Sequence, residues 1–244
     1  MSEKHTMLVF DNASEAGRPA AQWAQRLARA RGATCFETPP GTAIPVALDI
    51  ASKEDVDYLV TGLPSRCIGS VSVPDVDADL AVLMRRAPCP VWTVAPWAAG
   101  GDAHFAAAVV GVDPSPEASA AAHAAAVLLR GSRSLARLCL VHGLDVHPDE
   151  LAAAQPWSEI GAAMALERHP WLERLAGELA GPHLVVEFAV RPVFAPELIA
   201  GVVRRVDPDF VALGSGWRSE AAEPSASRLV RQVVRSVCCP MLTV

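Results

Sequence analysis

The 244-residue sequence lacks several patterns that would assign it directly to a functional class. It has no run of Lys or Arg and carries a formal net charge of −6, so nothing indicates a nucleic-acid or anionic membrane surface. Its apolar runs, such as residues 105–112, are far shorter than the roughly 20 residues that cross a bilayer. No apolar core of a signal peptide follows the polar residues 1–6. We therefore expect a soluble, cytoplasmic protein.

Motifs of common enzyme classes are also missing. There is no Gly-x-Ser-x-Gly nucleophile elbow, no phosphate-binding P-loop and no zinc-protease helix. Ser, His and Asp are present, but no spacing marks a catalytic triad. We therefore predict no catalytic residue.

Metal and redox sites are not predicted either. None of the six cysteines forms a Cys-x-x-Cys pair, and several lie in apolar segments, where thiols pack as small hydrophobic groups. The vicinal pair Cys238–Cys239 is the exception that merits a redox test. One polar cluster follows an apolar segment and consists of His142, Asp145, His147 and Asp149. Such residues can bind metals, but neighbouring loop residues are usually only polar, so we predict no metal site.

The sequence does contain an internal repeat of three pieces in the same order. The first piece is a short apolar strand, an Asp and an Ala-rich helix; the second is an acidic turn and a strand closed by Gly; the third is a Pro-initiated strand after a helix. The matched segments are 7–16 with 109–118, 54–62 with 206–214, and 86–94 with 236–244. We interpret them as two copies of one α/β unit, at residues 1–97 and 104–244.

The spacing of the pieces shows how the copies differ. The matched pieces are 102 positions apart in the first case, 152 in the second and 150 in the third. The first copy therefore lacks about fifty residues. In the second copy this space is predicted to hold strands 135–141 and 184–190, with helical stretches between them. The first copy has one strand near 34–38 instead, and a flexible linker is expected at 98–102.

Strands and helices alternate along the whole chain. This alternation predicts an α/β fold with a largely parallel sheet and helices on both faces. We expect five strands in the second copy and about four in the first.

These segments resemble the universal stress protein family. Members open with a strand ending in Asp, as at residues 109–113 with Ser115 close behind, and end with a Cys-Pro-Val type strand, as at 89–91 and 239–241. The resemblance implies two tandem flavodoxin-like, Rossmann-like doubly wound sheets, with order 3-2-1-4-5 in the complete copy. It also implies pairing of the final strands, 91–94 with 241–244, in an intramolecular pseudo-dimer across a pseudo-twofold axis. Whether the chain also forms a homodimer stays open.

Some family members bind ATP through Gly-x-x-Gly, nine residues, and then Gly-Ser or Gly-Thr after the fourth strand. Here Trp217 takes the place of the second glycine, and Ser227 and Arg228 replace the final pair, so the nucleotide motif is degenerate. Asp11, in the shortened copy, is interpreted as structural. The nucleotide-contacting residues that the resemblance implies are Asp113, Ser115, Val141, Gly214, Ser215, Gly216 and Ser227.

The sequence therefore favours a non-enzymatic universal-stress-type protein that acts in stress adaptation through contacts with protein partners. The alternative is an ATP- or AMP-binding regulatory module with its site in the second copy. We expect no cofactor under the first hypothesis and weak ATP or AMP binding under the second. Neither hypothesis involves nucleic acid or a membrane.

Overall fold

The computed structural model describes residues 5–10, 17–68, 71–74, 76–100, 104–132, 134–143, 169–214 and 224–244. The first half, up to residue 100, contains β1 (Thr6–Phe10), α1 (Gly17–Arg31), β2 (Thr34–Glu37), α2 (Ile44–Lys53), β3 (Tyr58–Gly62), β4 (Ser65–Ile68), β5 (Val71–Pro74), α3 (Ala78–Arg86), β6 (Val91–Val94) and the 3-10 helix η1 (Pro96–Gly100). The second half contains β7 (Ala107–Gly111), α4 (Pro116–Arg130), β8 (Ala136–Gly143), α7 (Pro170–Leu179), β9 (Leu184–Arg191), α8 (Ala195–Val206), β10 (Phe210–Leu213), α9 (Pro224–Ser236) and β11 (Met241–Thr243).

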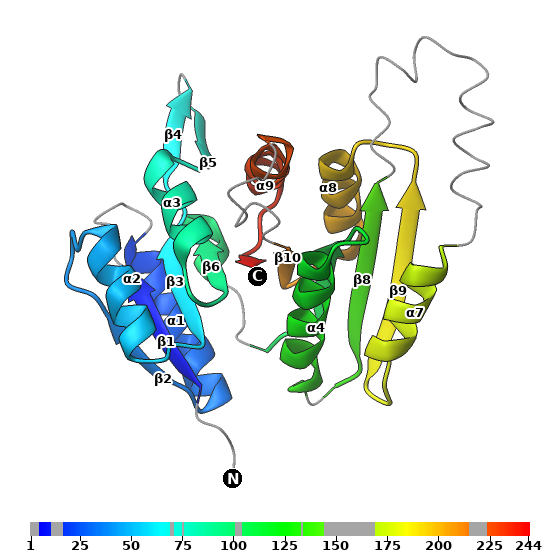
Figure 1. The fold of residues 1–244 in the computed structure, drawn as a ribbon, viewed down its shortest axis with the longest axis horizontal. Helices are drawn as coiled ribbons and strands as arrows, with labels where there is room; N and C mark the ends of the chain where they lie inside the picture. The colour runs from blue at the N-terminus through cyan, green and yellow to red at the C-terminus, as the bar shows by residue number, and fades with distance from the viewer. Residues whose placement is uncertain are drawn as a thin grey trace.

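One nine-stranded sheet runs through the described part of both halves, in the order β2-β1-β3-β6-β11-β10-β7-β8-β9 (Figure 1). Neighbouring strands are parallel except β6 and β11. Counted within the second half, the strands follow the order 3-2-1-4-5, which confirms the predicted fold. The helices divide between the two faces: α1, α4 and α7 pack on one, and α2, α3, α8 and α9 on the other.

The predicted pairing of the final strands is present. β6 and β11 run antiparallel, with Trp92 opposite Leu242, and the Thr93 hydroxyl lies 3.4 Å from the carbonyl oxygen of Met241. The pair makes the sheets of the two halves continuous. The division of the chain into copies at 1–97 and 104–244 stays an interpretation.

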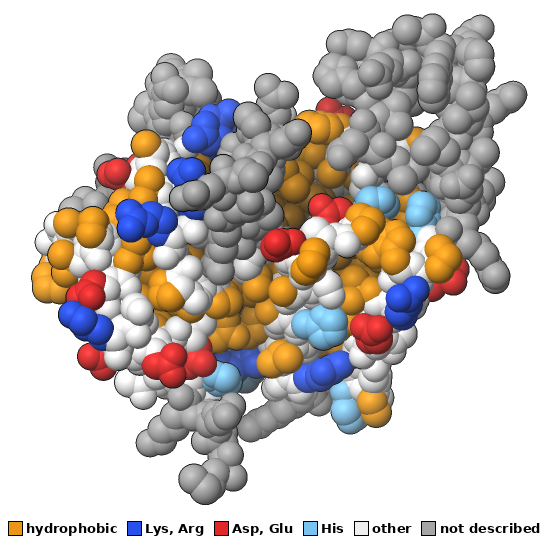
Figure 2. Space-filling model, in the orientation of Figure 1, with side chains coloured by type: hydrophobic (Ala, Val, Ile, Leu, Met, Phe, Trp, Pro, Cys, Tyr) orange, Lys and Arg blue, Asp and Glu red, His pale blue; other side chains and the backbone are white. Residues whose placement is uncertain are grey.

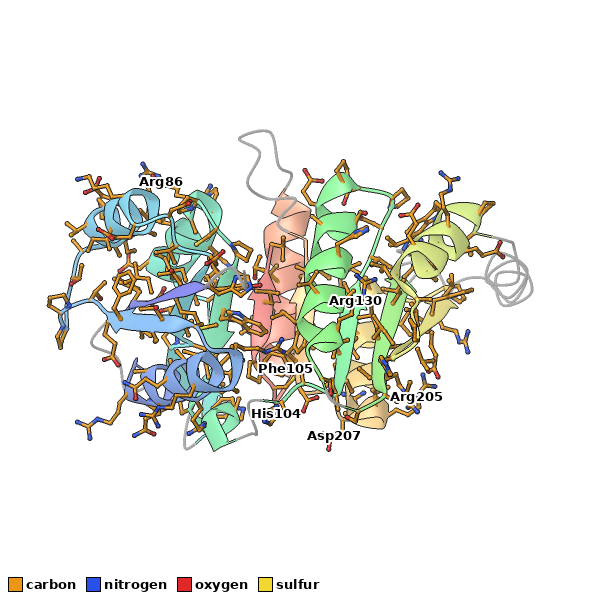
Figure 3. All side chains as sticks on the ribbon, turned by 90° about the horizontal axis from the view of Figure 1, so that it is seen from below. Arg86, His104, Phe105, Arg130, Arg205 and Asp207 are labelled. Carbon is orange, nitrogen blue, oxygen red and sulfur yellow. The ribbon has the colours of Figure 1, made fainter. Side chains whose placement is uncertain are left out.

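An aromatic cluster fills the core beneath this strand pair. The ring centres of Trp23 and Trp92 are 5.0 Å apart, and those of Phe105 and Phe210 are 4.8 Å apart. Phe105 lies between the two halves (Figure 3). Arg31 of α1 stacks over the Phe105 ring at 5.3 Å and donates a hydrogen bond to the Leu128 carbonyl of α4 at 2.5 Å. The halves thus share a core, held by aromatic and cation–π contacts as well as by the sheet.

The sheet register corrects the alignment of the first repeat piece by one residue. Met7 lies opposite Tyr58, and Ala108 lies opposite Phe210. Since Tyr58 and Phe210 are 152 positions apart, Met7 corresponds to Ala108 at a spacing of 101, not 102. Met7 and Ala108 also face the same core layer, whereas Val109 faces the other. Strands buried on both faces are apolar at nearly every position, so their sequence leaves a one-residue shift undetected.

Both halves build the start of the second repeat piece in the same way. Asp55 and Asp207 adopt left-handed conformations, with φ of 47° and 49°, within two residues of the ends of α2 and α8. Two residues later, Asp57 accepts a hydrogen bond from the backbone N–H of Thr6, and Asp209 accepts one from Ala107. The predicted acidic turn therefore ties the start of β3 to β1, and the start of β10 to β7.

Two features of the first half differ from the sequence prediction. The β4–β5 hairpin was not predicted, and it follows β3, with β5 lying beside α9 of the second half. The linker expected at 98–102 is not simply flexible, because η1 extends to Gly100 and Ala98 is buried. The single strand predicted near 34–38 is confirmed as β2. The helical stretch predicted around Trp157 lies outside the described residues.

Candidate functional site

A pocket of about 350 Å³ opens at the carboxyl ends of β7, β8 and β10. β7 lies between β8 and β10, so the chain connections leave it in opposite directions. Ligands of open α/β sheets bind at such switch points. Helices α4 and α8 both begin at this pocket. Its lining consists of Gly111, Val112, Asp113, Ser115, Ala118, Val141, His142, Gly143, Phe194, Ala195, Pro196, Ile199, Leu213, Gly214 and Leu229.

Asp113 and Ser115 build the start of α4. The Ser115 hydroxyl oxygen accepts a hydrogen bond from the backbone N–H of Ala118 at 3.2 Å, as expected of a helix N-cap. The Asp113 Oδ1 atom accepts one from the N–H of Ser115 at 2.9 Å. Asp113 is exposed and stands at the mouth of the pocket. Both side chains therefore have a structural role in addition to any contact with a ligand.

Gly214 brings the end of β10 against the first turn of α4. A Cβ atom at this position would lie 2.6 Å from the backbone nitrogen of Ala118, closer than real Cβ contacts allow. Val141, near the end of β8, is buried and forms part of the pocket floor. Glycine is therefore required at position 214 for the start of α4 and the end of β10 to meet.

The structure brings together four of the seven sequence-predicted site residues. Asp113, Ser115, Val141 and Gly214 line the same pocket. Ser227 lies in the first turn of α9, and the described residues do not include its side chain. Ser215, Gly216 and Asp11 lie outside the described residues, as do Asp145, His147 and Asp149 of the polar cluster.

The sequence did not identify two residues that shape the pocket. Gly111 lies at its floor. Glycine is needed there because a Cβ atom would lie 2.7 Å from the Leu213 side chain and 2.9 Å from that of Ile199. Phe194, just before α8, forms part of its wall. A glycine inside an apolar strand indicates a close approach in general, but not which side chains approach it.

His142 lies at the edge of the pocket, whereas the sequence indicates it only as part of a polar cluster. Its Nδ1 atom lies 2.8 Å from the carbonyl oxygen of Val112. Its ring contacts the rings of His169 and Trp171, at centre-to-centre distances of 5.9 and 5.1 Å. The chain thus brings His142 and His169 together across 26 intervening residues.

The pocket has little positive charge. Among its described lining residues, Asp113 is the only one with a carboxylate, and none is Lys or Arg. Glu117 and Glu197 occupy the first turns of α4 and α8, where a phosphate would otherwise be favoured. Figure 2 shows Lys and Arg side chains spread over the visible face among hydrophobic and acidic ones. The described electrostatics therefore favour a neutral or cationic group over an anion.

The vicinal cysteines differ in environment. Cys238 is exposed, whereas burial raises the pKa of the Cys239 thiol to about 12. A thiol must ionise to react as a nucleophile. Cys239 is therefore protonated at neutral pH and only partly exposed, whereas Cys238 is exposed to reagents.

Larger metal-binding clusters and membrane-spanning helices are absent from the described residues. These residues contain no group of three or more His, Cys, Asp or Glu side chains arranged to hold a metal ion. None of their helices has both the length and the apolar character that a bilayer crossing requires.

The family model of the universal stress proteins matches residues 105–244, more than half of the chain. The chain belongs to the universal stress protein family. A search of curated protein sequences finds no significant match. Among solved structures, a universal stress protein from Archaeoglobus fulgidus is 13% identical, with a TM-score of 0.62 over 99% of this chain and 98% of that one.

Two structures from Pseudomonas aeruginosa are similar over the same extent. A putative universal stress protein from strain UCBPP-PA14 is 13% identical with a TM-score of 0.55, and the match covers 99% of this chain and 82% of that one. A functionally unknown protein from strain PAO1 is 15% identical with a TM-score of 0.53, at the same coverage. At these identities the likeness shows the fold alone. This universal stress protein therefore shares the fold of those structures over nearly its whole length.

Proposed function

We propose that this chain is a non-enzymatic, cytoplasmic universal stress protein that acts in stress adaptation through contacts with other proteins. Membership of the family supports a stress-related role. The pocket supports the non-enzymatic part, because its polar side chains build the fold. A catalytic serine donates its proton to a base, but among the described residues the Ser115 hydroxyl has no side-chain base as a hydrogen-bond partner, and its oxygen caps α4 by accepting from the N–H of Ala118.

The observation that carries this proposal is that four backbone N–H groups at the starts of α4 and α8, beside the pocket, donate hydrogen bonds within the chain. Phosphate groups are held by such N–H groups at helix starts. At α4, Ser115 accepts from both Ala118 and Ser119. At α8, the Phe194 carbonyl accepts from Glu197 and Leu198. Each helix also has a proline at its start, which removes one more N–H donor.

Incubation with ATP tests the proposal. We expect no phosphate release above the buffer rate and no change in melting temperature, with or without Asp113→Ala. We also expect the Asp113→Ala variant to restore stress tolerance to cells that lack the protein, as the unmodified chain does. Phosphate release that Asp113→Ala abolishes would show an enzyme, and the proposal would then be wrong.

A second candidate is an AMP- or ATP-binding regulatory module, and the pocket favours it in one respect. Its volume of about 350 Å³ suits a small ligand, and it joins Asp113 and Ser115 to an apolar floor. A carboxylate beside a sheet switch point can accept hydrogen bonds from ribose hydroxyls. The nucleoside would then supply the contacts, and the phosphates would add little.

This second candidate is tested by comparing adenosine, AMP and ATP in the same titration. If the nucleoside carries binding, the three affinities agree within about threefold and Asp113→Ala weakens all three. An affinity that rises with each added phosphate would contradict this mode. Absence of binding by all three at millimolar concentration leaves the first proposal as the better account.

A further inference from the structure

The rings of His142, His169 and Trp171 form a cluster that neither proposed function uses. His142 lies near the end of β8, and His169 occupies the position directly before α7. Their rings are 5.9 Å apart with an interplanar angle of 70°. Two imidazoles this close suggest a shared third group.

The hydrogen bond of His142 defines which ring nitrogen is available. Its Nδ1 lies 2.8 Å from the Val112 carbonyl oxygen, which can only accept. Nδ1 therefore carries the proton, and in the neutral ring Nε2 keeps its lone pair. Histidines that bind metals typically donate their other ring N–H to a backbone carbonyl in this way, because the bond fixes both tautomer and orientation.

His169 supplies a second nitrogen that is buried without a partner. Its Nε2 atom has no hydrogen-bond partner among the described residues and almost no solvent-accessible surface. A buried polar atom in this state is unfavourable unless another group satisfies it. A cation between the two rings would do so.

The ring separation permits one shared ion when both Nε2 atoms face it. A metal bound at about 2.1 Å from Nε2 lies about 3.2 Å from the ring centre, so rings that share it are at most about 6.4 Å apart. The observed 5.9 Å is below this limit. Tetrahedral geometry places the centres about 5.2 Å apart, which requires the rings to close by less than about 1 Å.

We propose that His142 and His169 bind one divalent first-row transition metal of the Zn²⁺, Ni²⁺ or Cu²⁺ class, with water completing its coordination. Imidazole nitrogen suits these ions, whereas Mg²⁺ and Ca²⁺ prefer oxygen ligands. The site does not depend on either function proposed above.

Metal titration of the full chain tests this site. We expect Zn²⁺, measured by competition with a chromophoric chelator, to bind one high-affinity equivalent that Mg²⁺ and Ca²⁺ do not displace. His142→Ala and His169→Ala should each weaken binding at least tenfold. His123→Ala is the matched control, because the His123 Nδ1 also lies 2.8 Å from a backbone carbonyl, that of Ser119, on the exposed side of α4. Its loss should leave the affinity unchanged.

A measurement on the unmodified chain guards against variants that fail to fold. In a sample with ¹⁵N-labelled histidine, Zn²⁺ should shift the Nε2 resonances of two histidines and leave the His142 Nδ1 protonated. Blocking the exposed Cys238 thiol should change neither result. Zinc binding that survives both substitutions, that vanishes when Cys238 is blocked, or that is absent at 100 µM would each overturn the proposal.

Discussion

The two halves carry different residues at the corner of the sheet where the pocket of the second half lies. In the second half, the pocket floor depends on Gly111, with Leu213 and Ile199 beside it. By the register of the sheet, the residue of the first half that corresponds to Gly111 is Phe10, which is buried. A bulky ring thus stands in the first half where the second half has a glycine that Leu213 and Ile199 approach closely.

The rest of the first-half corner also has different residues. Its hollow, of about 480 Å³, is lined by Phe10, Thr61 and the acidic pair Asp77 and Asp79. Thr61 corresponds to Leu213 of the second half. The left-handed turns at Asp55 and Asp207 are nevertheless the same in both halves. The turns that align the strands are thus common to both halves, whereas the residues at this corner are not.

The largest expected effect is at the junction that both halves share. Trp92 is fully buried and contacts Trp23, Phe105 and Phe210. Trp92→Ala should lower the free energy of unfolding by about 3–5 kcal/mol, as large-to-small core changes do. Chemical denaturation should still show one transition, since each half loses packing. Trp97→Ala, at a half-exposed position, is the control and should change stability by less than about 0.5 kcal/mol.

Replacing one pocket residue by its first-half counterpart tests the comparison directly. Gly111→Phe places in the second half the side chain that the first half carries at Phe10. Because a Cβ there already meets Leu213 and Ile199, we expect a loss of about 1–3 kcal/mol from overpacking and the loss of any ligand bound in the pocket. Calorimetric unfolding and a ligand titration measure the two effects. A variant that keeps full stability would show that the pocket floor is not where the register places it.

The shared strand-start contacts should differ in strength between the halves. Asp209 accepts from the N–H groups of both Ala106 and Ala107, whereas Asp57 accepts from Thr6 alone among backbone donors and is more exposed. Asp209→Ala should therefore cost about 1–2 kcal/mol and Asp57→Ala about 0.5–1 kcal/mol. Urea unfolding of the two single variants measures the difference. Equal losses would mean that the second bond of Asp209 adds nothing.

The smallest expected effect concerns reactivity alone. A thiol-specific reagent at pH 8 should label Cys238 within minutes and leave Cys239 unlabelled in the folded chain. Cys239 is expected to be the less reactive thiol because its pKa is raised. Burial favours the neutral thiol, so Cys239 ionises only as the pH approaches about 12. Peptide mapping after labelling measures this, and unfolded protein is the control in which both react. Equal labelling in the folded state would contradict the burial of Cys239.

Most of the sheet could be predicted from the sequence because the residues that mark the ends of strands and helices lie beside them in the chain. Pro90 and Pro240 mark the starts of the two final strands, and Gly32 ends α1 with a φ of 65°. The 3-2-1-4-5 order and the β6–β11 pair followed from the resemblance. The pocket was predicted only in part: Asp113 and Gly214 follow strands, where sites gather, but Gly111 has a function only through residues more than 80 positions away.

The missed features depend on contacts between distant segments. The one-residue shift of β1 is undetectable in a strand that is apolar throughout. The meeting of His142 with His169 depends on how β8 and α7 are placed in space, which no local pattern records. The β4–β5 hairpin occupies a segment that a repeat comparison treats as a loop.

The antiparallel contact of β6 with β11 has a consequence for how the protein behaves on dilution. When such a contact joins separate chains, it forms and breaks with their concentration. Here both strands belong to one polypeptide, and about 150 residues separate them, so each experiences the other at an effective concentration set by the chain itself. This contact therefore persists at any concentration of the protein, however few molecules are present.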